Sequence, residues 1–244
     1  MKRILIVGAG AAFLGIAGPG YAADFPTMGP IAAARLFNWS GFYVGLNAGY
    51  SAGDTRINYD LPAFAGTMYP AGFIGGAQVG YNWQSGSLVL GLEADLAWRN
   101  GASNLGFAFP GGIDFALFHV EHNWLGTVRP RLGFAADNWL LYVTGGLAFG
   151  GLQHSYTESR PSTPGAIRTA SQDITRLGWT LGTGVEYAFG PQLSVGFEYL
   201  YVDLGRSILA LPAQVIVIAF PADSTRFRDT SHVVRAKLNW RFGS

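Results

Sequence analysis

The chain has 244 residues, with 16 Lys and Arg against 15 Asp and Glu, 35 glycines and no cysteine. A formal net charge of +1 gives no electrostatic bias toward nucleic acid, so no nucleic-acid partner is expected. The absence of cysteine excludes disulfide frameworks and thiol-ligated metals, so stability must come from hydrogen bonding and packing.

The first residues have the layout of a secretory signal peptide. Lys2 and Arg3 precede an apolar run over residues 4–17, and small residues follow that run. The run is shorter than the ~20 residues that a membrane-spanning helix needs, which disfavours the alternative of a retained anchor. We expect cleavage after Ala22, and hence export.

Eight stretches then alternate apolar residues with small or polar ones at a period of two. In the last stretch, Val234, Leu238 and Trp240 lie on one face and Arg235 and Lys237 on the other. The linkers are alternately short and long, which is typical of a barrel in an outer membrane. The sequence therefore predicts an all-β, eight-stranded, antiparallel up-and-down transmembrane β-barrel. The strands are predicted over 41–52, 72–83, 88–99, 119–135, 140–150, 176–189, 193–204 and 232–242.

Linker length predicts the orientation, because short turns of such barrels face the periplasm and long loops face outward. Both termini then lie on the periplasmic side. The long loops are rich in apolar residues, and we expect the strands to continue above the membrane with their apolar sides packed together. The alternative is an exposed contact surface for adhesion or for an extracellular ligand. The expected division is a signal peptide over 1–22, a periplasmic segment over 23–40 and an outer-membrane β-barrel over 41–244.

Tryptophans cluster near the strand ends, as expected for aromatic girdles at the two membrane interfaces. A soluble lipocalin-like barrel is the alternative, but it would direct its apolar face inward and its charges outward. The predicted girdles consist of Trp39, Trp83, Trp139 and Trp240 on the periplasmic side and Trp98, Trp124 and Trp179 on the other.

Charged residues share the inward faces with glycine and amide residues. In a lumen too narrow for bulk water they must pair, so we interpret them as an ion-pair plug. A narrow pathway for ions or small solutes, lined by the same residues, is the alternative. The predicted lumen network consists of Glu93, Asp95, Arg99, Arg129, Arg131, Glu186, Glu198, Arg235, Lys237 and Arg241.

No catalytic residue, metal site or cofactor is predicted. The four histidines, His119, His122, His154 and His232, fall at or beyond the outer strand ends, and their spacing is not diagnostic of acid-base or metal chemistry. Pro130 lies inside a predicted strand, where it removes a ladder donor, so a local irregularity is expected there.

Several segments resemble the small outer-membrane β-barrel proteins of alphaproteobacteria, known as porin-family or outer-membrane surface proteins. The matching segments are NWSGFYVGLNAGY over 38–50, WLGTVRPRLG over 124–133, LYVTGGLA over 141–148, GWTLGTGVE over 178–186 and EYLYVDLG over 198–205. The resemblance implies a barrel similar to the transmembrane domain of OmpA, a structural role in envelope integrity or host contact, and sometimes weak porin behaviour.

The resemblance also implies partners. These are outer-membrane lipid, lipopolysaccharide and the barrel-assembly machinery, which reads a terminal aromatic residue. Phe242 would be that signal, although Gly243 and Ser244 follow it here.

Overall fold

The computed structural model describes residues 37–59, 64–109, 114–162, 166–211, 214–215, 219–220 and 223–242. The expected signal peptide, its cleavage site and most of the expected periplasmic segment lie outside the described residues, as do Gly243 and Ser244. Within the described ranges, no helix is long and apolar enough to cross a membrane.

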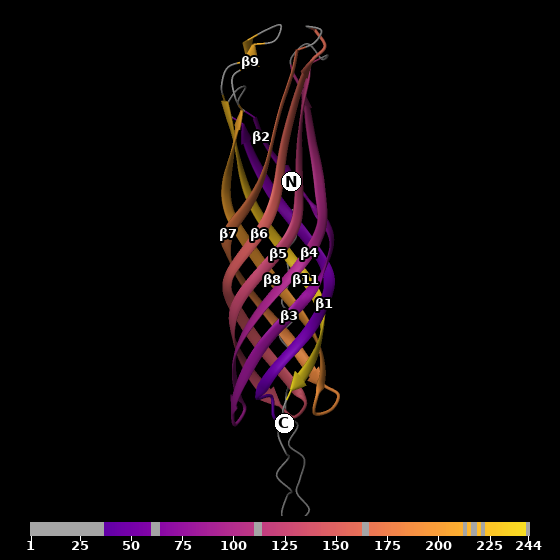
Figure 1. Ribbon diagram of the computed structural model, residues 1–244, viewed down its shortest axis with the longest axis vertical. Helices are drawn as coiled ribbons and strands as arrows, with labels where there is room; N and C mark the ends of the chain where they lie inside the picture. The colour runs from indigo at the N-terminus through magenta and orange to yellow at the C-terminus, as the bar shows by residue number, and fades with distance from the viewer. Residues whose placement is uncertain are drawn as a thin grey trace, which may run out of the picture. The chain divides into compact units, whose positions relative to one another are not determined.

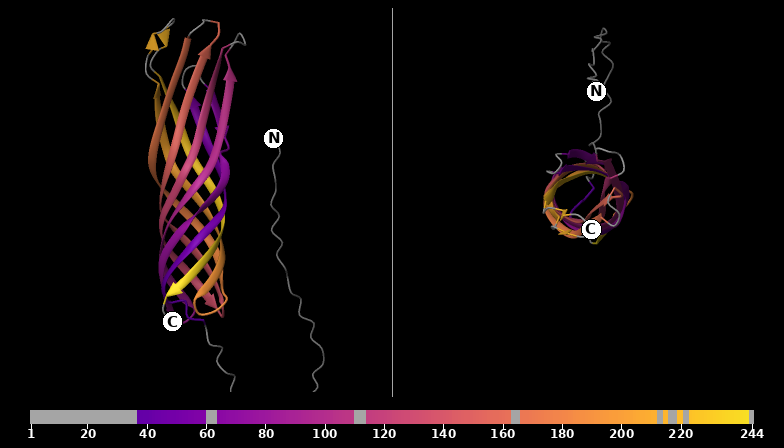
Figure 2. Two further views of the ribbon diagram at one scale, coloured as in Figure 1. Left: turned by 45° about the vertical axis from the view of Figure 1, so that its right-hand side comes forward. Right: turned by 90° about the horizontal axis from the view of Figure 1, so that it is seen from above.

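Eight long antiparallel strands form a closed ring (Figures 1 and 2). Each strand pairs with the next, and the last pairs with the first from Phe42 opposite Phe242 to Tyr59 opposite Thr225, which closes the cylinder. This confirms the predicted eight-stranded up-and-down barrel. The ring consists of β1 (Gly41–Tyr59), β3 (Ala71–Ser85), β4 (Leu88–Ala108), β5 (Phe115–Ala136), β6 (Trp139–Arg160), β7 (Ala166–Ala188), β8 (Leu193–Leu211) and β11 (Asp223–Phe242).

Three short strands lie outside the ring, at the end opposite the tight turns, which is the top of Figure 1 and is called the upper end below. β2 (Phe64–Met68) pairs with β1, and β9 (Gln214–Val215) pairs with β10 (Ala219–Phe220). At the lower end, Gly86 and Asp137 have positive φ angles of 59° and 49°, as two-residue hairpin turns require. Short and long connections therefore alternate as the sequence predicted.

The strands run further at the upper end than the sequence predicted. β6 and β7 continue to Arg160 and Ala166, through most of a segment that was expected to be a loop. Alternation persists there, but apolar side chains now face inward and pack together, which confirms the expected continuation above the membrane. The resulting upper apolar cluster contains Ile57, Met68, Ala116, Phe118, Val120, Tyr156, Leu209, Leu211 and Phe227.

Two ladders of the ring end below this cluster. β7 pairs with β8 only up to Trp179 opposite Asp203, and β3 pairs with β4 only up to Ala71 opposite Ala102. Above these points, in the described part of the chain, one sheet contains β2, β1, β11 and β8, and the other contains β4, β5, β6 and β7. The barrel thus continues upward as a two-sheet sandwich around the apolar cluster.

The outer surface of the lower part of the ring is apolar. Leu46, Leu96 and Leu181 are among many large side chains more than half exposed there. Exposed Trp83, Trp139 and Trp240 border this surface below, and exposed Trp98 and Trp179 border it above. A soluble barrel would show the reverse polarity, so this surface suits lipid. The segments between the two rows of tryptophan are called the membrane-spanning segments below.

Pro130 coincides with the expected irregularity. The β5–β6 ladder passes from Val128 opposite Leu147 to Arg131 opposite Thr144 with no pairing between them. The Pro130 carbonyl instead accepts a hydrogen bond of 2.9 Å from the Thr144 hydroxyl. A side chain therefore satisfies one backbone group at the gap that the missing donor leaves.

Glycine makes room for lumen side chains at two positions. A Cβ atom on Gly184 would lie 2.4 Å from the Tyr142 ring, and one on Gly80 would lie 2.3 Å from the Tyr43 hydroxyl. Gly75 differs, because the nearest atom to its Cβ would be 3.7 Å away.

We therefore expect Gly184→Ala to destabilise the barrel by about 1–3 kcal/mol, the usual cost of overpacking. Gly75→Ala is the matched control and should change stability little. Urea unfolding in detergent micelles, followed by heat-modifiable gel migration, measures both. Equal stability of the two variants would contradict the tight packing of Tyr142.

Candidate functional site

Eight charged side chains form a belt inside the membrane-spanning part of the barrel, called the lumen belt below. Four are carboxylates and four are cations, so their formal charges cancel. None is more than 6% exposed. The carboxylates are Glu93 and Asp95 on β4, Glu186 on β7 and Glu198 on β8; the cations are Arg129 and Arg131 on β5 and Arg235 and Lys237 on β11.

Strand register places opposite charges next to each other. Arg129 is the direct cross-strand partner of Glu93, and Arg235 is that of Glu198. Arg129 Nη2 lies 2.8 Å from Glu93, 3.0 Å from Asp95 and 3.2 Å from Glu198. These contacts join β5 to strands on both sides of the lumen.

Arg235 and Lys237 complete the centre of the belt from β11. The Arg235 guanidinium lies 2.9 Å from Asp95 and 2.7 Å from Glu198. Lys237 Nζ lies 2.7 Å from Glu93 and 3.4 Å from Glu198. Each cation therefore contacts at least two carboxylates, which reduces the desolvation cost of burying it.

Neutral side chains extend the network to the remaining strands. Tyr43 on β1 donates a hydrogen bond of 2.6 Å to Glu93, and Tyr142 on β6 donates one of 2.9 Å to Glu198. Arg131 lies between these two rings, 4.9 and 5.1 Å from their centroids, and donates to Asn82 on β3 and to Glu186. All eight strands of the ring thus contribute to one polar network.

The structure places two members of the predicted lumen network elsewhere. Arg99 lies higher, where its guanidinium reaches the Ser231 hydroxyl at 3.4 Å. Arg241 lies at the lower mouth, over the rings of Phe37 and Trp39 at 4.5 and 4.8 Å. Trp39 is only 1% exposed, so it lies within this mouth and not in the outer girdle. The cation–π contact with Arg241 holds it there.

The other predicted girdle members are exposed on the outer surface, except Trp124, which is half-buried. Its indole nitrogen lies close to where a Cβ atom of Gly151 would be, so the ring lies over the neighbouring strand. Phe242 ends β11 with half of its surface exposed, and its ring centroid is 5.9 Å from that of Phe42.

A second buried polar cluster lies above the upper tryptophans, which the sequence did not predict. His122 Nε2 is 3.8 Å and His154 Nε2 is 3.5 Å from the Asp229 carboxylate, which also accepts a hydrogen bond of 2.7 Å from Thr55. Both histidines were expected at the rim of the barrel. His154 lies inside because β6 continues upward and alternation turns its side chain inward. His122 lies inside because the irregularity between His122 and Trp124 shifts the alternation of β5 by one residue.

Burial lowers the pKa of His122 to about 4, and the nearby Arg99 guanidinium adds to this effect against the attraction of Asp229. Burial works to raise the pKa of Asp229, but the two imidazoles outweigh it and the net shift is downward. The other two histidines have surface partners: His119 contacts Asn104 and Glu121, and His232 contacts Tyr199. Across the described residues, no group of three or more His, Cys, Asp or Glu side chains could hold a metal ion.

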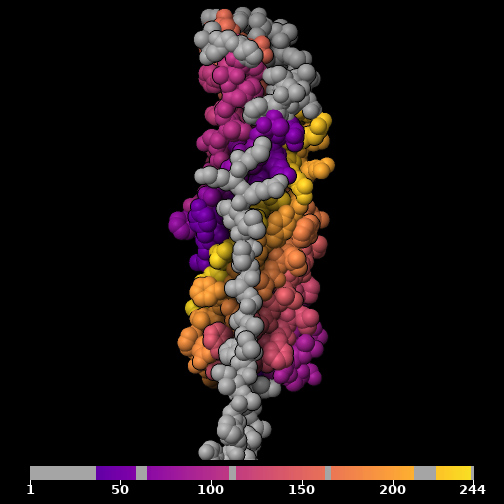
Figure 3. Space-filling model, turned by 180° about the vertical axis from the view of Figure 1, so that it is seen from behind, coloured from indigo at the N-terminus to yellow at the C-terminus, as the bar shows by residue number. Residues whose placement is uncertain are grey.

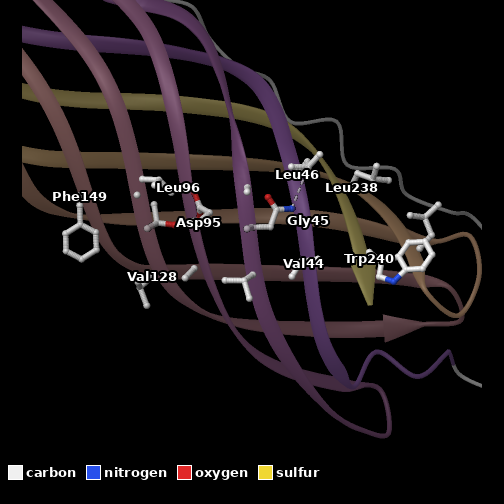
Figure 4. A pocket seen from close by; sticks show the side chains of 16 residues that line it. Val44, Gly45, Leu46, Asp95, Leu96, Val128, Phe149, Leu238 and Trp240 are labelled. Atoms are coloured by element: carbon white, nitrogen blue, oxygen red, sulfur yellow. Dashed lines mark hydrogen bonds between the residues drawn. The ribbon is translucent and has the colours of Figure 1, made fainter. Parts of the chain in front are cut away.

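An apolar groove of about 720 Å³ lies on the outer surface over β11, β1, β3, β4 and β5 (Figure 4). Outward side chains such as Leu46, Leu96 and Val128 border it, and small residues such as Ala77 and Gly126 form its floor. The groove belongs to the membrane-facing surface, so acyl chains are its natural contents.

The outward apolar surface, the aromatic borders and the closed ring together describe a membrane barrel, and known sequences agree. Residues 27–242 match the model of the outer membrane protein beta-barrel domain. The chain belongs to this family. It is 35% identical to the 31 kDa outer-membrane immunogenic protein of Brucella melitensis, over 89% of this chain and 88% of that protein.

Other relatives of this outer-membrane barrel include the 22 kDa outer membrane protein of Rhizobium leguminosarum bv. viciae, 32% identical over 68% of this chain and 64% of that protein. The crystal structure of OprG from Pseudomonas aeruginosa aligns with a TM-score of 0.48 at 10% identity, over 84% of this chain and 97% of that one. The family model and the two sequence relatives place the barrel in the outer membrane of a Gram-negative bacterium, as predicted. The names of the relatives describe outer-membrane and immunogenic proteins, not enzymes.

Arg129→Ala leaves Glu93, Asp95 and Glu198 with one cation fewer, and breaking such a buried pair costs about 3–5 kcal/mol. We expect this loss in urea unfolding of the refolded barrel. Arg176→Ala removes a partly exposed arginine of β7 and should change stability by less than about 0.5 kcal/mol. A small effect of Arg129→Ala would contradict the contribution of the lumen belt to stability.

Acid should weaken the upper cluster. The unfolded chain takes up a proton at His122 near pH 6.5 and the folded chain only near pH 4, so stability falls as the pH drops through this interval. Between pH 7.5 and 5 the expected loss is about 2 kcal/mol. His122→Gln should flatten this dependence and His119→Gln should not. If stability depends on pH in His122→Gln as it does in the wild type, His122 does not cause the loss of stability in acid.

Proposed function

We propose that the protein is a structural outer-membrane barrel that contributes to envelope integrity and surface exposure, with a lumen closed by ion pairs. The observation that carries this proposal is the lumen belt. It balances four carboxylates with four cations from five strands, and all eight side chains are almost inaccessible to solvent. Tyr43, Asn82 and Tyr142 connect it to the other three strands of the ring.

A conducting lumen needs binding weak enough for the solute to leave. Here an ion would have to displace contacts of 2.7–3.2 Å among several carboxylates and guanidinium groups. An eight-stranded barrel is just wide enough for side chains to fill its interior. The upper apolar cluster then forms a second layer across the same path, because its nine buried side chains come from both sheets of the sandwich.

The outer surface supports the structural role. Lipid would cover the apolar surface between the tryptophan rows, and the upper sandwich would present its loops outside the cell. Phe242, at the end of β11, would be the aromatic residue that the barrel-assembly machinery reads, since its ring is exposed on the outer surface. No cofactor and no catalytic step belong to the proposal.

The runner-up is a small porin for ions or small solutes, and planar-bilayer conductance of refolded protein separates the two. We expect no discrete channel steps from the wild-type barrel, because both layers of the lumen are filled. The double variant Arg129→Ala/Arg131→Ala removes two cations from the lumen belt and leaves the upper apolar cluster unchanged. Channel steps that appear only in this variant would show that the lumen belt closes the wild-type barrel.

Wild-type steps whose size or ion selectivity changes in the double variant would overturn the closed lumen and establish the porin. Arg176→Ala serves as the matched control, because it removes an arginine outside the lumen belt. Heat-modifiable migration confirms that each variant has folded before it is added to the bilayer.

A further inference from the structure

Three arginines lie side by side on the outer face of the upper sandwich. In the strand register, Arg56 on β1 is opposite Arg228 on β11, and Arg228 is opposite Arg206 on β8. All three are exposed, since their neighbours Ile57, Ser207 and Phe227 face inward. Like charges directly opposite each other destabilise a sheet, so the fold gains nothing from this arrangement. We call Arg56, Arg206 and Arg228 the arginine row.

Carboxylates neutralise the row only in part. Arg228 pairs with Asp203 at 3.0 Å, and Arg56 lies 3.8 Å from Asp54. Among the described residues, no carboxylate lies within ion-pair distance of Arg206. Three arginines therefore face two aspartates. The surface keeps a local excess of positive charge.

A small polar cleft lies beside Arg56 and Arg228, two of the three arginines of the row. Its volume is about 110 Å³, and Asp54, Arg56, Tyr201, Arg228 and Thr230 line it. This is the volume of roughly three to four water molecules. Two guanidinium groups and the Tyr201 hydroxyl provide donors around it. Such planar, always-charged donors suit the oxygens of a phosphate group.

The row lies just beyond the upper aromatic border. The Tyr201 ring lies 5.4 Å from that of Trp179 in the border, and Tyr201 is opposite His232 in the register. Arg228 lies four residues beyond His232, or about 13 Å along the strand. At a tilt of about 40° this places the row roughly 10 Å above the aromatic level, where headgroups and their sugars lie. Figure 3 shows the upper parts of β1 (indigo), β11 (yellow) and β8 (orange) together on one face.

We propose that Arg56, Arg206 and Arg228 bind the phosphate groups of an anionic lipid headgroup in the outer leaflet, that of lipopolysaccharide. The location favours a lipid over a soluble anion, because the arginines are exposed on the outer face of the sheet at the level of the headgroups. The phosphate would bridge three strands of the sheet and remove the repulsion among their arginines. This proposal depends on the outer-membrane location and is independent of whether the lumen conducts.

Refolded full-length barrel in phosphatidylcholine nanodiscs, titrated with bis-phosphorylated lipid A, tests the site. Thermal stability and native mass spectrometry report binding. Each basic residue near an anionic surface contributes roughly fivefold, so R56Q/R206Q/R228Q should weaken binding about 100-fold. Dephosphorylated lipid A should bind the wild type as weakly as the triple variant binds the phosphorylated form.

The matched control is T169E/S171E/T175E, which changes the net charge by the same amount on exposed positions of the opposite sheet. It should retain wild-type binding. R56K/R206K/R228K, which keeps the charges, should retain most of it. Heat-modifiable migration checks that all variants are folded.

Three results would overturn the proposal. The first is equal binding by the wild type and the triple glutamine variant, and the second is an equal loss in the glutamate control. The third is stabilisation by heparin or inorganic phosphate alone that matches that of lipid A, which would assign the row to a soluble anion.

Discussion

The rest of the structure depends on charge balance inside a closed ring. Once β11 pairs with β1, the ladder has no edge in the membrane, and the interior becomes a narrow space from which water is largely excluded. Ionised groups can stay there only in pairs. The register provides those pairs, since Glu93 and Arg129 on β4 and β5 are direct neighbours, as are Glu198 and Arg235 on β8 and β11. Closure of the ring therefore makes charge pairing necessary, and the strand register of the closed ring provides the pairs.

The medium outside the barrel changes along each strand, and the side-chain pattern changes with it. On β11, Leu238 faces outward and Arg235 inward where lipid surrounds the barrel. Higher on the same strand, Arg228 faces outward and Phe227 inward, because water and headgroups now surround it. On β11 the period of two continues without interruption while the two faces exchange polarity, whereas on β5 an irregularity between His122 and Trp124 shifts it by one residue. One strand thus builds a polar lumen below and an apolar core above.

This exchange divides the molecule into parts with separate roles. In the proposed function, the lower ring supplies the lipid contact and the closed lumen, and the upper sandwich supplies the surface outside the cell. The buried His122, His154 and Asp229 lie between two apolar layers, because on β6 His154 stands between Leu152 of a lower buried apolar cluster and Tyr156 of the upper one. The arginine row lies at a similar level on the outside, where the membrane ends.

The sequence by itself determined the strand number, the orientation of connections and the inward or outward direction of most side chains, because alternation and linker length are local signals. It also indicated the eight residues of the lumen belt, since each shares a strand face with glycine or amide residues. Only the tertiary structure decided which charges meet, because register between distant strands sets those contacts. It separated Arg99 and Arg241 from the belt, turned Trp39 into the lower mouth, and brought His122 and His154 to Asp229. It also aligned Arg56 with Arg206 and Arg228, because the last two lie on consecutive strands of the ring and Arg56 becomes their neighbour only when β1 pairs with β11.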